Sequence, residues 1–329
     1  MPNNEAIKVL VTGATGRIGR HVVDELKAHG FKIRAVTSQP LSAEQKAATD
    51  IEWRQQDFAK SSDVDALVEG CHAIQHLAAN LWDIPKMPMA NVEATRALGE
   101  AANTYGVRFF GFTSSITVYG SAKSKDVNEN TPLLTGDRDV AEEYRGNPSI
   151  RAYGRSKVLG ERVLAAAASN VECVIFRPTV VVDLPIMVGI AQRNFPKQFV
   201  LGSRHEHHIY VKDVAHALVW FMQRSLDRTT PKPGVEIFNL ADDAASAVTG
   251  AAIAARAKAL TGSPKFRSTL GGPVFAYNLI DMLTNRRFSL RYPLGMMVYS
   301  NKKLMDAGYR FKYGLDEAQR LAFAPFASK

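Results

Sequence analysis

The sequence predicts an α/β fold: a Rossmann-type, doubly wound parallel sheet with a smaller, discontinuous C-terminal domain. Three observations lead to this prediction. An apolar run rich in β-branched residues, 6–12, leads directly into a glycine-rich turn, as a buried parallel strand does. Strand-like and helix-like segments then alternate as far as about Pro178. At 329 residues the chain can bury a large core.

The glycine-rich turn predicts a dinucleotide site. Gly13 allows a tight turn, Gly16 lets the backbone approach a pyrophosphate, and Gly19 lets the next helix pack close to the sheet. That helix is expected from Arg17 to Ala28, and its first N–H groups and partial positive charge favour phosphate. Because the strand and the helix are both present, the pattern is more specific than a glycine triplet alone.

The second strand, 31–38, bears on the choice of cofactor. NAD-selective sites place an acidic residue near the end of this strand to bind the ribose 2′-hydroxyl. No acid occurs at residues 36–39, which leaves room for a 2′-phosphate that Arg17 or Arg34 could contact. The alternative is that both arginines are solvated surface residues. We therefore expect NADP or NAD, with NADP favoured, and we expect Asp57, after the third strand, at the adenine edge.

Two later motifs predict proton transfer at a C–OH or C=O centre. Tyr153 and Lys157 are four residues apart, which places them on one face of a helix. A tyrosine with an ordinary pKa of about 10 is a poor acid or base near neutrality, and a nearby ammonium lowers that pKa. The string 113–115, Thr-Ser-Ser, follows a strand and supplies a hydroxyl for a substrate oxygen. Any amphipathic helix can hold the Tyr/Lys pair, so the prediction depends on the glycine turn and the hydroxyl string as well.

In this order the motifs resemble those of an extended short-chain dehydrogenase/reductase. That group, of the NAD-dependent epimerase/dehydratase type, includes nucleotide-sugar epimerases, dihydroflavonol reductases and 3β-hydroxysteroid dehydrogenases. The resemblance covers most of the chain and is carried by 6–28, Asp57, 76–79, Asn91, 112–120, 153–157, 176–178, 210–215 and 302–309.

The resemblance implies roles for individual residues. Ser115 takes the position of the catalytic hydroxyl, Tyr153 that of the general acid/base, and Lys157 also binds the nicotinamide ribose. It also implies a homodimer formed through the helices at about 91–105 and 150–168. The expected cofactor-binding residues are Gly13, Thr15, Gly16, Arg17, Ile18, Gly19, Arg34, Ser38, Asp57, Phe58, Leu77, Ala78, Ala79, Thr113, Tyr153, Lys157 and Pro178.

Departures from the family's patterns indicate the reaction. Sugar dehydratases carry an acidic pair after the hydroxyl residue, where this chain has Ile116 and Thr117. Nucleotide-sugar epimerases place an arginine where this chain has Glu206, although Arg204 is close. We therefore expect an NAD(P)-dependent alcohol dehydrogenase or carbonyl reductase that passes a hydride between nicotinamide and a small-molecule substrate. A nucleotide-sugar epimerase and a non-catalytic nucleotide-binding relative remain as alternatives.

The division into domains follows the regularity of the pattern. We expect residues 1–183 and 207–244 to form the dinucleotide-binding domain, and 184–206 and 245–329 to form a substrate-binding cap. The long stretch between the serine and tyrosine motifs, 121–149, is expected to border the active site.

Composition sets further expectations. Cys71 and Cys173 are expected to be buried free thiols, with no disulfide framework, in a reducing cytoplasm. The net charge of +9 is expected to be a solvated basic surface, without the motifs of a nucleic-acid partner. No apolar run is long enough for a membrane span, and no signal peptide is expected.

One histidine cluster, His205, His207 and His208, raises the question of a metal site. It runs straight into an expected strand, where successive side chains point apart. We therefore expect no metal site, and favour a role for these residues in lining the substrate pocket.

Overall fold

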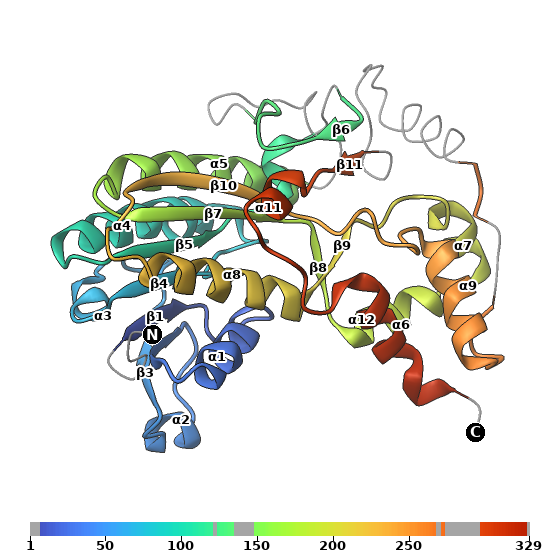
Figure 1. The fold of residues 1–329 in the computed structure, drawn as a ribbon, viewed down its shortest axis with the longest axis horizontal. Helices are drawn as coiled ribbons and strands as arrows, with labels where there is room; N and C mark the ends of the chain where they lie inside the picture. The colour runs from blue at the N-terminus through green and yellow to red at the C-terminus, as the bar shows by residue number, and fades with distance from the viewer. Residues whose placement is uncertain (1–6, 121–123, 135–147, 268–270, 274–296, 328–329) are drawn as a thin grey trace.

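A seven-stranded parallel sheet forms the centre of the protein (Figure 1). The computed structural model describes residues 7–120, 124–134, 148–267, 271–273 and 297–327. The strands lie in the order β10-β7-β5-β4-β1-β2-β3, so the chain reverses direction across the sheet between β1 and β4. This order confirms the predicted doubly wound fold. The strands are β1 (Lys8–Thr12), β2 (Lys32–Thr37), β3 (Ile51–Gln55), β4 (Ala73–His76), β5 (Phe109–Thr113), β7 (Glu172–Pro178) and β10 (Gly234–Leu240).

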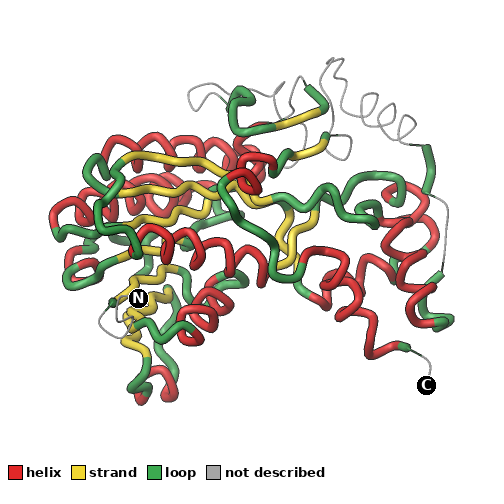
Figure 2. Tube along the Cα trace, in the orientation of Figure 1, coloured by secondary structure: helices red, strands yellow, loops and turns green. Residues whose placement is uncertain are grey.

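Helices cover both faces of the sheet, as Figure 2 shows. Successive apolar side chains along each strand point to opposite faces of the sheet and belong to two separate cores. Val9 and Val11 lie in one core, and Leu10 lies in the other. The first core is closed by α1 (Gly19–Ala28) and α8 (Val211–Leu226), and the second by α3 (Asp65–Val68), α4 (Ala94–Thr104) and α5 (Pro148–Ala167). The short α2 (Ala43–Ala47) lies between β2 and β3.

A second group of helices lies beyond the carboxyl end of the sheet, on the right in Figure 1. Its members are α6 (Leu184–Ala191), α7 (Phe195–Leu201), α9 (Gly250–Thr261) and α12 (Gly314–Phe323). Apolar residues of α6, α9 and α12 form a third core. Two small parallel sheets complete the fold: β8 (Val180–Val182) with β9 (His208–Tyr210), and β6 (Asp126–Val127) with β11 (Val298–Tyr299).

One segment assigned to the cap from the sequence packs elsewhere. Leu304, on α11 (Lys302–Asp306), and Tyr309 are fully buried in the first core against α8 and the sheet. The expected cap segment 245–329 therefore contains a stretch that belongs with the dinucleotide-binding domain. Its apolar side chains find their partners on the sheet side, which spacing along the chain does not reveal.

Local boundaries follow the expectations closely. The first helix begins at Gly19, two residues later than expected, and the chain leaves it through Gly30, which has a φ of +76°. The third strand ends at Gln55, so Asp57 lies in the turn that follows it. Cys71 and Cys173 are buried and free, as predicted.

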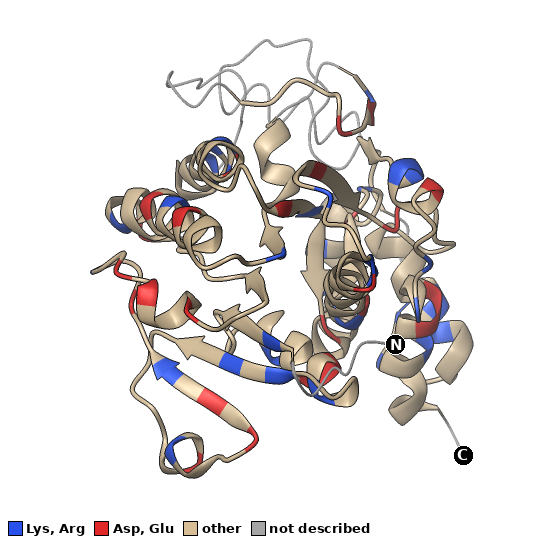
Figure 3. Ribbon diagram, turned by 60° about the vertical axis from the view of Figure 1, so that its left-hand side comes forward, with Lys and Arg blue, Asp and Glu red and all other residues tan. Residues whose placement is uncertain are grey.

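Charged residues of both signs are distributed along the chain. Figure 3 shows lysine and arginine interspersed with aspartate and glutamate over the helices and strands of that view. No helix in the described ranges is both long and apolar enough to cross a membrane.

Candidate active site

Two cavities adjoin one another at the carboxyl edge of the sheet. The smaller, of about 270 Å³, lies over the ends of β1 and β2, and the larger, of about 590 Å³, lies between the ends of β5 and β7 and the cap. Leu77, directly after β4, lines both cavities. This edge, where the strand order reverses, is where doubly wound sheets bind ligands.

The smaller cavity has the backbone of a phosphate cradle. Gly13 has a φ of +66°, and a Cβ on it would lie 2.9 Å from the backbone nitrogen of Ala78. A Cβ on Gly19 would lie 2.1 Å from the Gly13 carbonyl oxygen, so only glycine lets α1 approach this closely. The Gly16 N–H bonds back to that same carbonyl oxygen at 2.9 Å.

The open side of this loop offers backbone donors. Among the described residues, the N–H groups of Thr15, Arg17 and Ile18 donate to no protein acceptor. They lie at the start of α1, where the helix dipole favours an anion. The cradle therefore fits the pyrophosphate of a dinucleotide. Of the expected cofactor residues, those that line this cavity are Gly13, Thr15, Gly16, Ser38, Asp57, Phe58, Leu77, Ala78 and Ala79.

Polar contacts hold the rim of this cavity in place. The Thr12 hydroxyl contacts His76 Nδ1 at 2.7 Å and accepts from the N–H groups of Leu77 and Ala78, which ties β1 to the end of β4. Asp57 Oδ1 accepts from the Ala59 N–H at 3.0 Å. The Asp57 side chain therefore shapes the turn after β3.

Arg34 was wrongly placed by the sequence-based interpretation. It is buried, its Nε donates to Glu52 at 2.9 Å, and its Nη1 donates to carbonyl oxygens at the end of α3, including that of Leu67 at 2.8 Å. It lies three residues before the end of β2, about 10 Å from the carboxyl edge. Arg34 therefore neutralises a helix C-terminus and cannot contact a cofactor in this cavity.

Seven other expected cofactor residues do not line the smaller cavity. The larger cavity is lined by Ile18, Thr113, Tyr153, Lys157 and Pro178. Gly19 is buried at the start of α1. Arg17 is exposed, and its Nη1 donates to the Val181 carbonyl oxygen at 3.1 Å, so it reaches towards β8.

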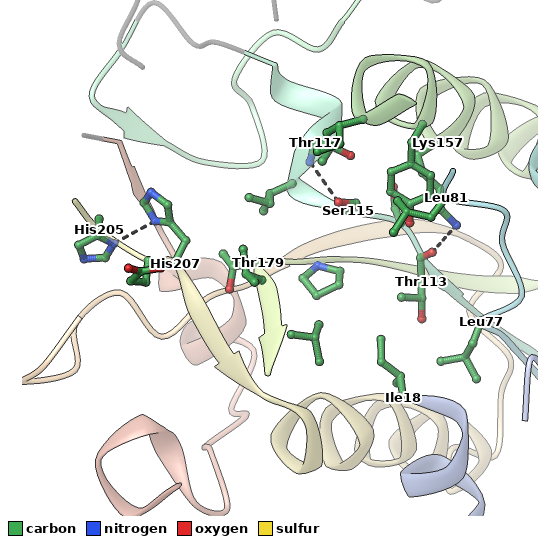
Figure 4. Close-up of a pocket in the computed structure, with 18 of the residues that line it drawn as sticks. Ile18, Leu77, Leu81, Thr113, Ser115, Thr117, Lys157, Thr179, His205 and His207 are labelled. Atoms are coloured by element: carbon green, nitrogen blue, oxygen red, sulfur yellow. Dashed lines mark hydrogen bonds between the residues drawn. The ribbon is translucent and has the colours of Figure 1, made fainter. Parts of the chain in front are cut away.

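The larger cavity brings the three expected catalytic residues together. Ser115, Tyr153 and Lys157 all line it. Ser115 precedes a 3₁₀ helix, Ile116–Tyr119, and its Oγ accepts from the Thr117 N–H at 3.2 Å. Lys157 Nζ donates to the Thr113 carbonyl oxygen at 2.8 Å, and Figure 4 shows both contacts.

Burial changes the acidity of the Tyr/Lys pair. Lys157 is 1% exposed, its Nζ lies 4.6 Å from the centre of the Phe112 ring, and burial lowers its pKa to about 7. Burial also raises the pKa of Tyr153 well above its ordinary value. The sequence predicted that Lys157 would lower the Tyr153 pKa. In this structure the ammonium points to a carbonyl, 5.7 Å from the tyrosine ring centre, and burial moves the Tyr153 pKa in the opposite direction.

A buried ion pair behind the cavity was missed by the sequence analysis. Arg177, on β7, donates to both carboxylate oxygens of Glu161 at 3.0 and 2.6 Å, and Ser114 donates to the same carboxylate at 2.5 Å. Glu161 lies one turn after Lys157 on α5. The sequence did contain a signal for this ion pair: Glu161 is four residues after Lys157 and eight after Tyr153, which places it on the same buried helix face.

The rest of the larger cavity is mainly apolar, with a polar end. Its apolar lining comprises Ile18, Leu77, Leu81, Trp82, Ile116, Ile150, Pro178, Val180, Val181 and Leu201. Glu206, where epimerases place an arginine, lines the cavity but forms a salt bridge with Arg193. Arg204 lines the cavity as well.

The polar end contains two of the three clustered histidines. His205 and His207 line the cavity and lie at the opposite end from Lys157 in Figure 4. Their Nδ1 atoms are 2.9 Å apart, and Asp243, which follows β10, joins them. The two residues are two positions apart and both line this end of the cavity, so alternation along the chain does not separate them. His208 is directed elsewhere and lies 3.8 Å from Glu206.

Part of the expected border of the site is outside the described residues. Positions 121–123 and 135–147 of the long stretch between the serine and tyrosine motifs are not described.

The sequence matches a known family. A model of the NAD dependent epimerase/dehydratase family matches residues 9–182, more than half of the chain. The chain belongs to this family. The match confirms the expected resemblance to extended short-chain dehydrogenases/reductases, and it includes the glycine cradle and the Ser/Tyr/Lys set.

Relatives of this epimerase/dehydratase family member carry out different reactions. Cinnamoyl-CoA reductase 1 of Oryza sativa subsp. japonica is 26% identical over 240 residues, 68% of this chain and 69% of that protein. A putative dihydroflavonol 4-reductase of Synechocystis sp. is 28% identical over 64% of this chain and 62% of its own length. UDP-glucose 4-epimerase of Lactobacillus helveticus is 28% identical over 49% of this chain and 47% of its own length.

Solved structures show the same fold. Vestitone reductase from alfalfa aligns with a TM-score of 0.70 at 19% identity, over 96% of this chain and 97% of its own. MoeE5, in complex with UDP-glucuronic acid and NAD, aligns with a TM-score of 0.68 at 21% identity, over 95% and 96% of the two chains.

Proposed function

We propose that this family member is a nicotinamide-dependent dehydrogenase or carbonyl reductase acting on a small molecule with an apolar part. The observation that carries the proposal is the larger cavity. It combines Ser115, Tyr153 and Lys157 with a mainly apolar wall, and it shares Leu77 with the phosphate cradle. NAD is present in a structure of the similar fold, which supports a nicotinamide cofactor.

The smaller cavity would bind the dinucleotide, and the larger cavity would bind the substrate. The Gly13–Gly19 loop and Ser38 would hold the dinucleotide, and Asp57 would lie at its adenine end. The bound nicotinamide supplies a hydride donor or acceptor. Ser115 Oγ would donate to the substrate oxygen as charge develops there.

Tyr153 is best suited to act as a general acid. Because burial raises its pKa, the phenol keeps its proton at neutral pH and can transfer it to an oxygen that becomes an alkoxide. Lys157, whose pKa of about 7 lets it hold or release a proton, is one helical turn away and would position the nicotinamide ribose. These states favour carbonyl reduction near neutral pH.

A nucleotide-sugar epimerase is the second candidate. Arg204 lines the polar end of the cavity and could bind a diphosphate, and a UDP-glucose 4-epimerase is among the relatives. Against it, Glu206 places a carboxylate on the same wall. The two candidates differ in cofactor use, because an epimerase returns the hydride to its own substrate.

A turnover screen distinguishes the candidates. The protein is incubated with NADPH or NADH and a panel of aromatic and aliphatic ketones, aldehydes and UDP-sugars, and the absorbance of the reduced nicotinamide is followed. The proposal expects net oxidation with at least one apolar carbonyl compound and none with UDP-sugars. Conversion of a UDP-sugar to its epimer without net cofactor change would refute the proposal and favour the epimerase.

We also propose, by analogy with the family, that the protein is a cytoplasmic homodimer formed through α4 and α5. The neighbouring positions of these helices on one face of the sheet support this. Sedimentation velocity at micromolar concentration tests the dimer.

A further inference from the structure

The polar end of the larger cavity contains a convergent set of ligand atoms. His205 Nδ1 lies 2.9 Å from His207 Nδ1 and 3.6 Å from Asp243 Oδ1, and His207 Nδ1 lies 3.2 Å from Asp243 Oδ2. The two histidines precede β9, and the aspartate follows β10, so the group joins two segments far apart in the sequence. We propose that these three residues form a binding site for a divalent transition-metal ion of the Zn²⁺ type.

Hydrogen bonds among the three residues do not suit both histidine Nδ1 atoms and the carboxylate at once. Each Nδ1 carries either a proton or a lone pair, and a carboxylate only accepts. If His207 Nδ1 donates to Asp243, it cannot accept from His205. If His205 donates to His207, the lone pairs of His207 and Asp243 face each other. With one proton, two electron-rich atoms stay in contact. With a proton on each Nδ1, the two N–H groups face each other across 2.9 Å. A cation bound in place of these protons removes either repulsion.

The aspartate provides a second, independent observation. Its side chain is 3% exposed, and within the described ranges Oδ1 has no hydrogen-bond partner. Oδ2 accepts from the Tyr299 N–H at 2.7 Å, which fixes the carboxylate with Oδ1 towards His205. A buried carboxylate oxygen with nothing to accept is costly unless a cation binds it.

The spacing suits a small metal ion. Metal–ligand bonds of about 2.0–2.1 Å place neighbouring ligands about 2.9 Å apart in an octahedral site and about 3.3 Å apart in a tetrahedral one. The three observed separations, 2.9, 3.2 and 3.6 Å, span these values. Two imidazoles with one carboxylate suit Zn²⁺ and its neighbours, whereas Mg²⁺ and Ca²⁺ prefer oxygen ligands.

The backbone around His207 has an unusual conformation. Its φ of 51° lies in the left-handed region, which residues other than glycine seldom adopt. The ring is packed edge-on against Tyr299, 5.0 Å between ring centres, which holds Nδ1 towards His205. Because both imidazoles line the cavity, the remaining coordination positions of a metal would face it, open to water or to a ligand oxygen.

Metal binding is tested on the full chain without an affinity tag, after treatment with a chelator. Zn²⁺ is titrated by calorimetry, and Co²⁺ is titrated by visible absorption as a report on coordination geometry. We expect one high-affinity equivalent, with a dissociation constant in the micromolar range or below. This readout does not depend on catalytic activity, so it stands apart from the proposed function.

Variants identify the ligands. His207→Asn keeps a residue that tolerates the left-handed backbone, and Asp243→Asn keeps an oxygen for the Tyr299 N–H, so both should fold. Each should weaken Zn²⁺ binding at least about tenfold, because even the loss of a supporting contact costs that much. His29→Asn, at an exposed histidine, serves as the matched control and should bind Zn²⁺ like the unaltered chain. The proposal is overturned if the unaltered chain binds Zn²⁺ only in the millimolar range, or if the two variants bind as tightly as it does.

Discussion

Lys157→Met should stabilise the folded protein while it abolishes activity. Lys157 is 1% exposed, and burial lowers its pKa from the ordinary 10.5 to about 7. At about 1.4 kcal/mol for each pKa unit between the folded and unfolded states, burying the charged amine costs about 5 kcal/mol. Methionine has a similar length and carries no charge. Because it cannot donate to the Thr113 carbonyl oxygen, that oxygen loses its hydrogen bond, which costs about 1–3 kcal/mol of stability. The free energy of unfolding should therefore rise by about 2–4 kcal/mol at pH 6.

The difference in unfolding free energy between the two proteins should depend on pH. Below pH 7 the lysine is charged in both states, so the full burial cost applies. Between pH 7 and 10.5 the unfolded chain binds a proton that the folded chain does not, so the stability of the unaltered protein rises with pH. That rise is about 1.4 kcal/mol for each pH unit. The advantage of the methionine variant should accordingly shrink, and be nearly lost by about pH 9.

Urea denaturation at pH 6, 7.5 and 9, followed by tryptophan fluorescence, measures both proteins. Lys32→Met, at an exposed lysine on β2, is the control and should change stability by less than about 0.5 kcal/mol. A Lys157→Met protein that is less stable at pH 6, or a difference that stays constant with pH, would refute the reasoning. The result expected is a buried amine kept for function at the expense of stability.

Three further predictions concern catalysis and cofactor binding. Tyr153→Phe should lower turnover by about 10²–10⁴-fold with nearly unchanged cofactor affinity. The control Tyr105→Phe should leave turnover unchanged. Near-normal turnover of a folded Tyr153→Phe protein would reject Tyr153 as the general acid. Gly16→Val should weaken NAD(P) binding at least about tenfold in calorimetry, because its side chain would occupy the cradle and its Cβ would lie only 3.1 Å from the Gly13 oxygen. The rest of the fold should stay intact, and unchanged affinity would contradict the cradle. NADPH should bind more tightly than NADH, but within about tenfold, because no acid ends β2 and no lysine or arginine lines the described cradle cavity; tighter NADH binding would contradict this.

The features that sequence predicted well are those set by local spacing. Gly13 was expected to make a tight turn, and it has the positive φ that such a turn requires. The four-residue spacing of Tyr153 and Lys157 does bring both side chains into one cavity. In each case a few neighbouring residues determine the geometry, so the sequence alone is enough to predict it.

The features that sequence missed depend on distant partners. Arg34 carries the charge expected of a phosphate contact, but Glu52 and the end of α3 lie closer and engage its guanidinium. Asp243 lies just after β10, at the carboxyl edge where ligands bind, which was a signal. Its pairing with His205 and His207 could not be foreseen, because it depends on how β9 and the end of β10 meet in space.

The residues outside the cavity explain why the acid inside it is well placed. Two buried polar contacts, one turn apart, join helix α5 to the sheet. Lys157 bonds the carbonyl at the end of β5, and Glu161 bonds Arg177 of β7 and Ser114. Breaking a buried pair of this kind typically costs about 3–5 kcal/mol, so α5 cannot slide along the sheet without a large penalty. Tyr153 lies one turn before Lys157 on the same helix, so the contacts of Lys157 and Glu161 both fix its position. The Glu161–Arg177 pair therefore acts on the chemistry by fixing the helix, although neither residue lines the cavity.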